Sequence, residues 1–135
     1  MIFLDTSFLF AFYSARDERH DLAQAMMKDI ANGKYGHAYL SDYVFDELIT
    51  TVFSRLKNLQ EAIRVGKSLR STVDFLYVGI DEFESAWKIF SDQRTTSLSF
   101  TDCTIAALMK ANGIDRIATF DADFKGIKGI SAVNA

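Results

Sequence analysis

Acidic residues stand at the ends of several apolar stretches in this sequence. Asp5 follows the apolar run that opens the chain and precedes another one, in MIFLDTSFLF. Burying a carboxylate among apolar neighbours costs free energy unless the group is paired with a cation or takes up a proton. Asp102 has a similar setting in SFTDCTIAAL, and Asp121 lies within TFDADF. Acids gathered at one place would repel each other, and a divalent cation bound between them would offset that repulsion.

Each of these acids also has a structural explanation. Aspartate is a favoured N-cap, because its side chain accepts hydrogen bonds from backbone N–H groups that lack a partner within the helix. Capping explains Asp5 as well as metal binding does, and it is the favoured explanation for Asp121, near which Asp123 competes as the cap. Asp102 differs, since a nearby Ser or Thr already supplies a capping oxygen. We therefore expect Asp102 to be a surplus anion at the start of its helix.

Apolar runs that alternate with helical stripes indicate the elements that position these acids. Short apolar runs are typical of strands buried on both faces of a sheet, and clear or weaker runs occur at residues 1–4, 38–40, 75–80, 116–119 and 129–133. Segments with apolar residues at helical spacing lie between them. This alternation predicts one α/β domain over residues 1–135, with a mostly parallel sheet and right-handed crossovers. Ligands of such sheets bind beyond the carboxyl ends of the strands, where we expect the three acids to meet.

The segment after Ser41 has the clearest helical pattern. Its apolar stripe consists of Phe45, Leu48, Ile49, Val52, Phe53 and Leu56. Ser41 occupies the N-cap position of this helix, and Asp81 occupies the corresponding position after residues 75–80. Glu47 lies nearly opposite the centre of the stripe, so it faces either solvent or a cleft. Spacing alone does not distinguish Glu47 from Asp46 as a site residue.

Composition limits the classes of function. The chain has 135 residues, of which 49% are hydrophobic, and this is enough apolar side chain for one core. The formal charge of -3 excludes the strongly basic surface of nonspecific nucleic-acid binders, so any nucleic acid must be held locally. Cys103 is the single cysteine, which excludes an internal disulfide and a cysteine-based zinc site, and we expect it to be a core residue. The chain shows no basic leader and no apolar window of membrane-spanning length, so we expect a cytoplasmic protein without membrane contact.

Four short motifs, in their order and spacing, resemble the signature of PIN domains. They are LDTS, SDYVFDEL, SFTDCTIAA and ATFDADF, and they extend over nearly the whole chain. PIN domains are metal-dependent ribonucleases that include the VapC-type toxins. The resemblance implies a PIN-like, three-layer α/β/α fold with a central, mostly parallel sheet. It also implies hydrolysis of phosphodiester bonds in single-stranded RNA, by a toxin with a small antitoxin partner or by a stand-alone RNA-processing enzyme.

The family pattern assigns a role to each acid. Its four acids correspond to Asp5, Glu47, Asp102 and Asp121. Asp5 and Asp102 are the expected principal ligands of Mg²⁺ or Mn²⁺, with Glu47 and Asp121 as further ligands or as residues that orient water. Oxygen ligands without His or Cys suit these hard cations. A bound cation of this kind can activate water for attack on a phosphodiester.

The resemblance also suggests supporting residues around the acids. Thr6 and Thr119 match small hydroxyl residues that neighbour the acids in the family and are expected to bond to water at the metal, and Asp123 is a supporting candidate. Rim residues that would contact phosphate are Arg16, Arg55, Arg94 and Lys125. A homodimer is expected mainly from the family resemblance.

Alternatives from two other classes remain open at this stage. An Mg²⁺-dependent phosphotransfer or receiver-type domain also has an aspartate after its first strand, but it needs a lysine at a later strand end, and none has that place here. A catalytically degenerate PIN-fold interaction module is disfavoured by the presence of all four acids. The apolar helix faces at residues 8–13 and 45–56 suit an antitoxin helix or a second copy of the chain, although burial in the core is the simpler explanation.

Overall fold

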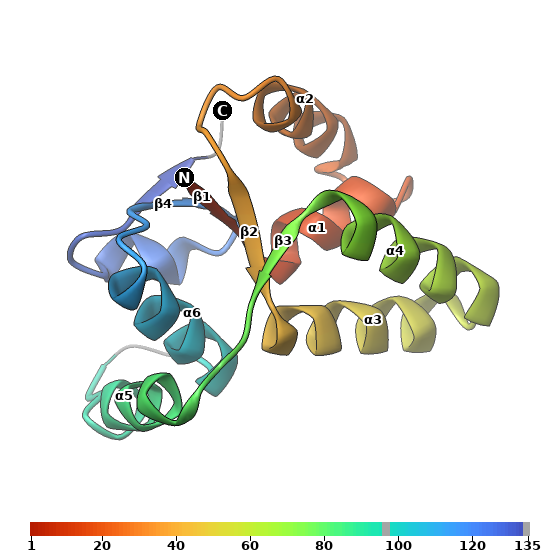
Figure 1. Cartoon of the computed structure of the whole chain (residues 1–135). Coiled ribbons are helices and arrows are strands. Elements are labelled where there is room, and N and C mark those ends of the chain that lie inside the picture. Colours follow the sequence, from red (N-terminus) through yellow and green to blue (C-terminus); the bar gives the residue numbers. More distant parts are fainter. Residues whose placement is uncertain (96–97, 134–135) are drawn as a thin grey trace.

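A parallel sheet forms the centre of the protein (Figure 1). In residues 1–95 and 98–133, which the computed structural model describes, the sheet has five strands in the order β3-β2-β1-β4-β5, and every neighbouring pair is parallel. The strands are β1 (Ile2–Leu4), β2 (Ala38–Ser41), β3 (Asp74–Leu76), β4 (Arg116–Ala118) and β5 (Ser131–Val133). This order confirms the predicted parallel α/β fold. It excludes the receiver-type alternative, because receiver domains have the order 2-1-3-4-5.

Helices cover both faces of the sheet, so the fold has three layers. Figure 1 shows α1 to α4 on one side of the sheet and α5 and α6 on the other. The helices are α1 (Thr6–Tyr13), α2 (His20–Ala31), α3 (Asp42–Leu56), α4 (Leu59–Thr72), α5 (Ile80–Ser91) and α6 (Phe100–Ala111), and the short 3-10 helix η1 (Ala122–Gly126) follows β4. Within the described residues, no helix is long and apolar enough to cross a membrane.

The central strand β1 determines where a ligand can bind. The chain passes from β1 to β2 and β3 on one side, and then returns through α5 and α6 to β4 on the other side. The connections therefore change direction between β1 and β4, which is where open parallel sheets leave a crevice at their carboxyl edge. Asp5 and Thr119 directly follow these two strands, and the backbone N–H of Asp5 donates to the carbonyl of Ala118 at 3.1 Å.

The core lies around β1 and the helices that pack on it. The three residues of β1 are each 0% exposed, as are Phe8 of α1 and Phe124 of η1. Complete burial of β1 follows from its central place, since it has a paired strand on each side and helices on each face. The prediction of a strand covered on both faces is confirmed for this segment.

The predicted strand at residues 75–80 is too long. β3 ends at Leu76, while Tyr77 and Ile80 are 70% and 83% exposed and Ile80 begins α5. β3 is an edge strand that pairs only with β2, so the apolar run continues beyond the part that the sheet can bury. The N-cap of α5 is Gly79 and not Asp81, which lies in the first turn, where an acid interacts favourably with the helix dipole.

The stripe of α3 divides into a buried half and an outer half. Ser41 is the N-cap, as predicted, and accepts a hydrogen bond from Val44 N at 3.1 Å. Leu48 and Val52 are buried with Val44, whereas Phe53 is 51% exposed and Leu56 is 39% exposed. The expectation that the whole stripe is core is therefore wrong, and Phe53 instead lines the groove between α3 and α4.

Candidate active site

Asp5 is the buried centre of the site. It is 4% exposed, and it is both the last residue before α1 and the N-cap of that helix. Its Oδ1 accepts a hydrogen bond from Thr6 N at 2.7 Å, and its Oδ2 accepts bonds from Thr119 Oγ1 at 2.6 Å and Ser7 Oγ at 3.0 Å. A carboxylate can accept about four hydrogen bonds, so this arrangement leaves it capacity for a further partner. Capping and a role in the site are therefore compatible in Asp5.

Two backbone N–H groups determine how the hydroxyls around Asp5 are oriented. Phe120 N donates to Ser7 Oγ, and Asp121 N donates to Thr119 Oγ1, each at 3.0 Å. Since both hydroxyl oxygens act as acceptors here, each hydroxyl proton is available to bond to Asp5. A carboxylate that receives these bonds is favoured in its ionised form.

Two opposing effects act on the ionisation of Asp5. Burial is the largest effect and raises the pKa of Asp5 above its ordinary value, while the hydrogen bonds from Thr119, Ser7 and Thr6 lower it. The nearby charge of Glu47 raises this pKa as well. A cation beside Asp5 would favour the ionised form and reverse the effect of burial.

Asp102 lies close enough to the other acids to be affected by their charges. Burial is the largest effect on its pKa, and burial together with the charges of Asp5 and Asp121 raises that pKa to about 6, against the lowering effect of the hydrogen bonds with Ser99. Asp102 is not the surplus anion that we expected. It forms a capping box with Ser99, in which its Oδ2 accepts from Ser99 N at 3.0 Å and its own N–H donates to Ser99 Oγ at 3.1 Å. In the capping box the carboxylate accepts the Ser99 N–H through Oδ2.

Asp121 is the cap of η1. Its Oδ1 accepts a hydrogen bond from Asp123 N at 2.9 Å, while Asp123 itself is exposed. Asp121, and not Asp123, is therefore the capping residue. As in Asp102, one carboxylate oxygen is used locally, and the effect of Asp121 on the pKa of Asp102 places its charge near the site.

Glu47 faces a cleft and not only bulk solvent. The cleft has a volume of about 310 Å³ and is lined by residues of α1, α3 and the segment before α2, among them Thr6, Ser7, Arg19, Glu47 and Arg55. Asp46, which spacing did not distinguish from Glu47, does not line this cleft. Among the described residues, the Oγ1 of Thr6 is the buried side-chain oxygen that has no hydrogen-bond partner.

The donor set at this edge suits a hard divalent cation. It consists of carboxylate and hydroxyl oxygens. Asp5 accepts three of the roughly four hydrogen bonds that a carboxylate can take, and Asp102 and Asp121 each use one oxygen in capping. In residues 1–95 and 98–133, no three acidic, His or Cys side chains are gathered as a ready-made ligand cluster. Mg²⁺ commonly uses only one or two carboxylates and keeps several waters, so acids that are spread around one edge of the sheet fit this cation.

Sequence reasoning missed two residues that the structure brings to the site. Ser7 contacts Asp5, Thr119 and Phe120, and its place in LDTS, two residues after Asp5, was the signal available for it. Arg19 lines the Glu47 cleft, and nothing in its local sequence indicates this.

Of the predicted phosphate contacts, Arg55 lines the same cleft, whereas Arg16, Arg94 and Lys125 are exposed and do not line it. Cys103 is a buried core residue, and burial raises the pKa of its thiol to about 11.

Comparisons with known proteins agree with this fold and site. The PIN domain family model matches residues 2–130. The chain is 31% identical over 124 residues, 92% of each protein, to the 23S rRNA-specific endonuclease VapC20 of Mycobacterium tuberculosis. The crystal structure of that protein, described as a Sarcin-Ricin loop cleaving toxin, superposes with a TM-score of 0.88 at 29% identity over 100% of both chains. The VapBC2 complex of Rickettsia felis, bound to a promoter DNA fragment, has a chain with the same fold, with a TM-score of 0.76 at 18% identity over 99% of this chain and 98% of that one. The protein belongs to the PIN-domain family.

Proposed function

We propose that this protein is a divalent-metal-dependent endoribonuclease of the VapC toxin kind, which hydrolyses phosphodiester bonds in single-stranded regions of RNA. The main observation behind the proposal is the buried Asp5, held by Thr119 and Ser7 beside a cleft that contains Glu47 and the unpartnered Thr6 hydroxyl. The similarity to a 23S rRNA-specific endonuclease supports it and makes 23S rRNA the first substrate to test. A cytoplasmic location follows from such a substrate.

Each residue of the site has a distinct task in this proposal. A bound Mg²⁺ or Mn²⁺ supplies charge that stabilises the phosphate during attack and lowers the pKa of water. Asp5, Asp102 and Asp121 would hold the cation. Thr119 keeps the Asp5 carboxylate in one orientation, and Glu47 is placed to accept a proton or to orient the attacking water.

A cleavage assay tests the proposal. Purified protein is incubated with labelled single-stranded RNA and with 23S rRNA, in Mg²⁺ or Mn²⁺ and in EDTA. We expect metal-dependent cleavage, with a rate at least about 100-fold lower in Asp102→Asn. Removing one group that stabilises the charge of the transition state typically lowers the rate by this factor or more. Asp115→Asn is the matched control, because Asp115 is exposed and precedes β4 at the opposite edge of the sheet.

Failure of this assay would be informative in two ways. If the wild-type protein binds metal but cuts neither RNA, a catalytically degenerate PIN module becomes the better explanation. If no metal binds, the carboxylates serve only as caps, and the site assignment is wrong.

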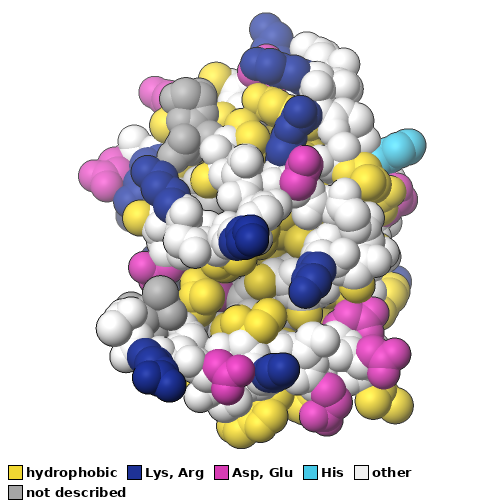
Figure 2. All heavy atoms as spheres, turned by 90° about the vertical axis from the view of Figure 1, so that its left-hand side faces the viewer, with side chains coloured by type: hydrophobic (Ala, Val, Ile, Leu, Met, Phe, Trp, Pro, Cys, Tyr) yellow, Lys and Arg dark blue, Asp and Glu magenta, His cyan; other side chains and the backbone are white. Residues whose placement is uncertain are grey.

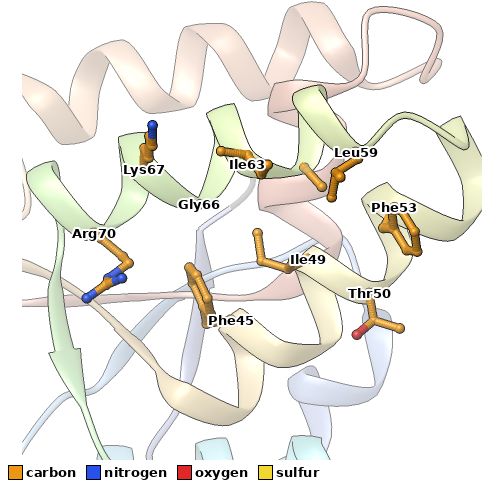
Figure 3. Close-up of a pocket in the computed structure, with 10 residues that line it drawn as sticks. Phe45, Ile49, Thr50, Phe53, Leu59, Ile63, Gly66, Lys67 and Arg70 are labelled. Atoms are coloured by element: carbon orange, nitrogen blue, oxygen red, sulfur yellow. The ribbon is translucent and has the colours of Figure 1, made fainter.

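The groove between α3 and α4 suits an antitoxin segment. It has a volume of about 500 Å³ and is mostly apolar, and Phe53 and Leu59 at its end are 51% and 57% exposed. Figure 3 shows Phe45 and Ile49 of α3 facing α4 across the groove, with Arg70 at the other end. The complexed state of related toxins supports a short protein partner that lays an apolar helix there. Expression of the chain is then expected to arrest growth, with relief by co-expression of the partner and no arrest by Asp5→Asn.

An aromatic patch on the other side of the sheet suits a second copy of the chain. Phe83, Trp87 and Phe90 of α5 are 42%, 53% and 37% exposed, and their rings lie within 5.2 to 6.5 Å of the Phe100 ring. Figure 2 shows the face that carries α5 and α6, where hydrophobic side chains lie among charges of both signs. Exposed apolar patches that are rimmed by polar residues mark interaction surfaces. We therefore propose that two copies of the chain form a homodimer through this patch.

A further inference from the structure

We propose that Arg19 and Arg55 form a phosphate clamp that holds the RNA backbone on the Glu47 side of the acids. This inference rests on the proposed ribonuclease function and adds the residues that bind its substrate. Arg19 precedes α2, and Arg55 lies in the last turn of α3. Both line the same cleft of about 310 Å³, although they are 36 positions apart in sequence (55 minus 19).

Each arginine is held in place by an aromatic ring. The guanidinium carbon of Arg19 lies 5.2 Å from the centre of the Phe120 ring, and that of Arg55 lies 5.0 Å from the centre of the Phe10 ring. A guanidinium that lies over an aromatic ring can still donate hydrogen bonds from the N–H groups at its edge. Paired N–H donors fit the oxygens of a phosphate.

Among residues 1–95 and 98–133, neither arginine forms an ion pair. In the described part of the chain, the ion pairs are Lys34 with Asp29 and Arg64 with Glu61. The cleft has acids of its own, Asp17, Glu18 and Glu47, but none of them forms an ion pair with Arg19 or Arg55. The side chain of Asp17 instead accepts a hydrogen bond from the backbone N–H of Arg19 at 2.8 Å. The positive charges of both arginines are thus available to a ligand.

An unpartnered buried hydroxyl points to a polar ligand in the same cleft. Thr6 is 8% exposed, its Oγ1 has no partner among the described residues, and it lines the cleft together with the two arginines. A buried hydroxyl without a hydrogen bond costs free energy, which a ligand oxygen would recover. The backbone N–H of Thr6 also bonds to Asp5, so an anion bound here lies next to the acid at the centre of the site.

The position of the cleft favours RNA over an acidic protein segment. A carboxylate could make similar bonds to the arginines, but the cleft adjoins Asp5, whereas the apolar groove that suits a protein partner lies between α3 and α4 and shares no lining residue with it. An RNA chain that enters the site from this side would have a phosphate at Arg19 and Arg55 and would continue past Thr6 toward Asp5.

RNA binding by an inactive protein tests the clamp. In the Asp102→Asn background with Mg²⁺, the affinity for a labelled single-stranded RNA is measured for Arg19→Ala and Arg55→Ala. We expect each substitution to weaken binding roughly tenfold, as for a lost hydrogen bond to a charged group. Each should also reduce the slope of log affinity against log salt by about 0.7, the value for one phosphate contact in a single strand. Arg19→Lys and Arg55→Lys keep the charge and should retain the slope.

Arg116→Ala is the matched control. Arg116 is also exposed and stacked on a ring, 5.8 Å from the centre of Tyr35, but it begins β4 at the opposite edge of the sheet. If Arg19→Ala and Arg55→Ala bind RNA in this background as tightly as Arg116→Ala does, and with the same salt dependence, the clamp is wrong while the ribonuclease function stands. If the wild-type protein neither binds nor cuts RNA with either metal, the proposed function fails, and the clamp fails with it.

Discussion

At the scale of single residues, the site depends on hydroxyl groups as much as on acids. Ser7 and Thr119 direct their hydroxyl protons at one oxygen of Asp5, and the backbone of the following segment fixes both hydroxyls in turn. Groups that orient a metal ligand commonly affect metal affinity or activity by 10- to 100-fold. In the proposed site, the hydroxyls that orient Asp5 therefore matter as well as the acids.

Ser7→Ala tests this role. We expect cleavage to fall by about 10-fold and the concentration of Mg²⁺ needed for half-maximal activity to rise, because Asp5 loses one of its hydrogen bonds. The free energy of unfolding should fall by about 1 to 2 kcal/mol, since Phe120 N loses its acceptor. Ser71→Ala, which removes an exposed hydroxyl on α4, is the control. An unchanged dependence on Mg²⁺ in Ser7→Ala would contradict the positioning role.

The raised pKa of Asp102 predicts a pH dependence of stability. The pKa is raised from 3.8 to about 6 in the folded state, so the folded protein binds a proton more tightly than the unfolded chain. The free energy of unfolding of the metal-free protein should therefore fall as the pH rises from about 4 to about 6, and stay low above that. Asp5 acts in the same direction.

Thermal unfolding in EDTA measures this effect. Asp102→Asn should stabilise the metal-free protein at about pH 8 by roughly 1 kcal/mol, a value kept small because solvent screens a half-buried group. It should have little effect at about pH 5, where Asp102 is already mostly protonated. Equal shifts at both pH values would show that the charge of Asp102 does not destabilise the fold.

At the scale of elements, α3 serves two surfaces at once. Its buried face packs in the core through Leu48 and Val52, while Glu47 and Arg55 line the cleft. A helix presents residues three or four apart on one face, so the orientation of α3 decides the position of both groups. Ser41 fixes the start of α3, because it is the last residue of β2 and the N-cap of the helix. Its side chain is fully buried.

Ser41→Ala should therefore affect both stability and activity. We expect a loss of about 1 to 2 kcal/mol in urea unfolding, because Val44 N loses its cap. Asn58→Ala removes the exposed cap of α4 and should cost about 1 kcal/mol, with RNA cleavage unchanged. If both variants cut RNA equally well per folded molecule, the cap of α3 has no role in placing Glu47.

The groove between α3 and α4 depends on a glycine in the middle of α4. A Cβ at Gly66 would lie 3.4 Å from both Phe45 Cζ and Ile49 Cδ1, which is ordinary van der Waals contact. Gly66→Ala should therefore raise the free energy of unfolding by about 0.5 to 1 kcal/mol, because alanine is a better helix former. Gly126→Ala in η1, where nothing lies within 4 Å of the added atom, should gain less. A destabilised Gly66→Ala would mean that α3 and α4 are packed too closely for the added methyl group.

At the scale of the whole molecule, the two apolar surfaces lie on different layers. The α3–α4 groove belongs to the helices on one side of the sheet, and the aromatic patch belongs to α5 and α6 on the other (Figure 1). A bound partner at one surface would leave the other free. If both proposed partners bind, this separation would let an antitoxin segment and a second copy bind at the same time.

Sedimentation at micromolar concentration tests the dimer. We expect a dimer for the wild-type protein and a monomer for Trp87→Glu, since a charge at the patch would have to be desolvated on association. Phe53→Glu, an equally exposed position in the groove, should leave the dimer intact. Wild-type protein that sediments only as a monomer would refute the homodimer.

Local sequence patterns determined much of this fold. The buried strand β1, the cap at Ser41 and the alternation of strands and helices were all predicted correctly, because each depends on residues within one or two turns of each other. The edge strand β3 was predicted too long, because an apolar run does not show whether a neighbouring strand exists to pair with it. The order of the motifs, which is also a property of the sequence, is the basis for proposing the four acids as site residues.

Only the tertiary structure decided which side chains meet. Thr119 and Asp5 are 114 positions apart and bond to each other because β1 and β4 pair in a register that sets their ends side by side. The same pairing brings Ser7 to Phe120, and the packing of α1 against α3 brings Arg19 and Arg55 to one cleft. Such contacts depend on strand register and on how helices pack across the sheet. These are global properties of the fold, and the spacing of residues along one segment does not contain them.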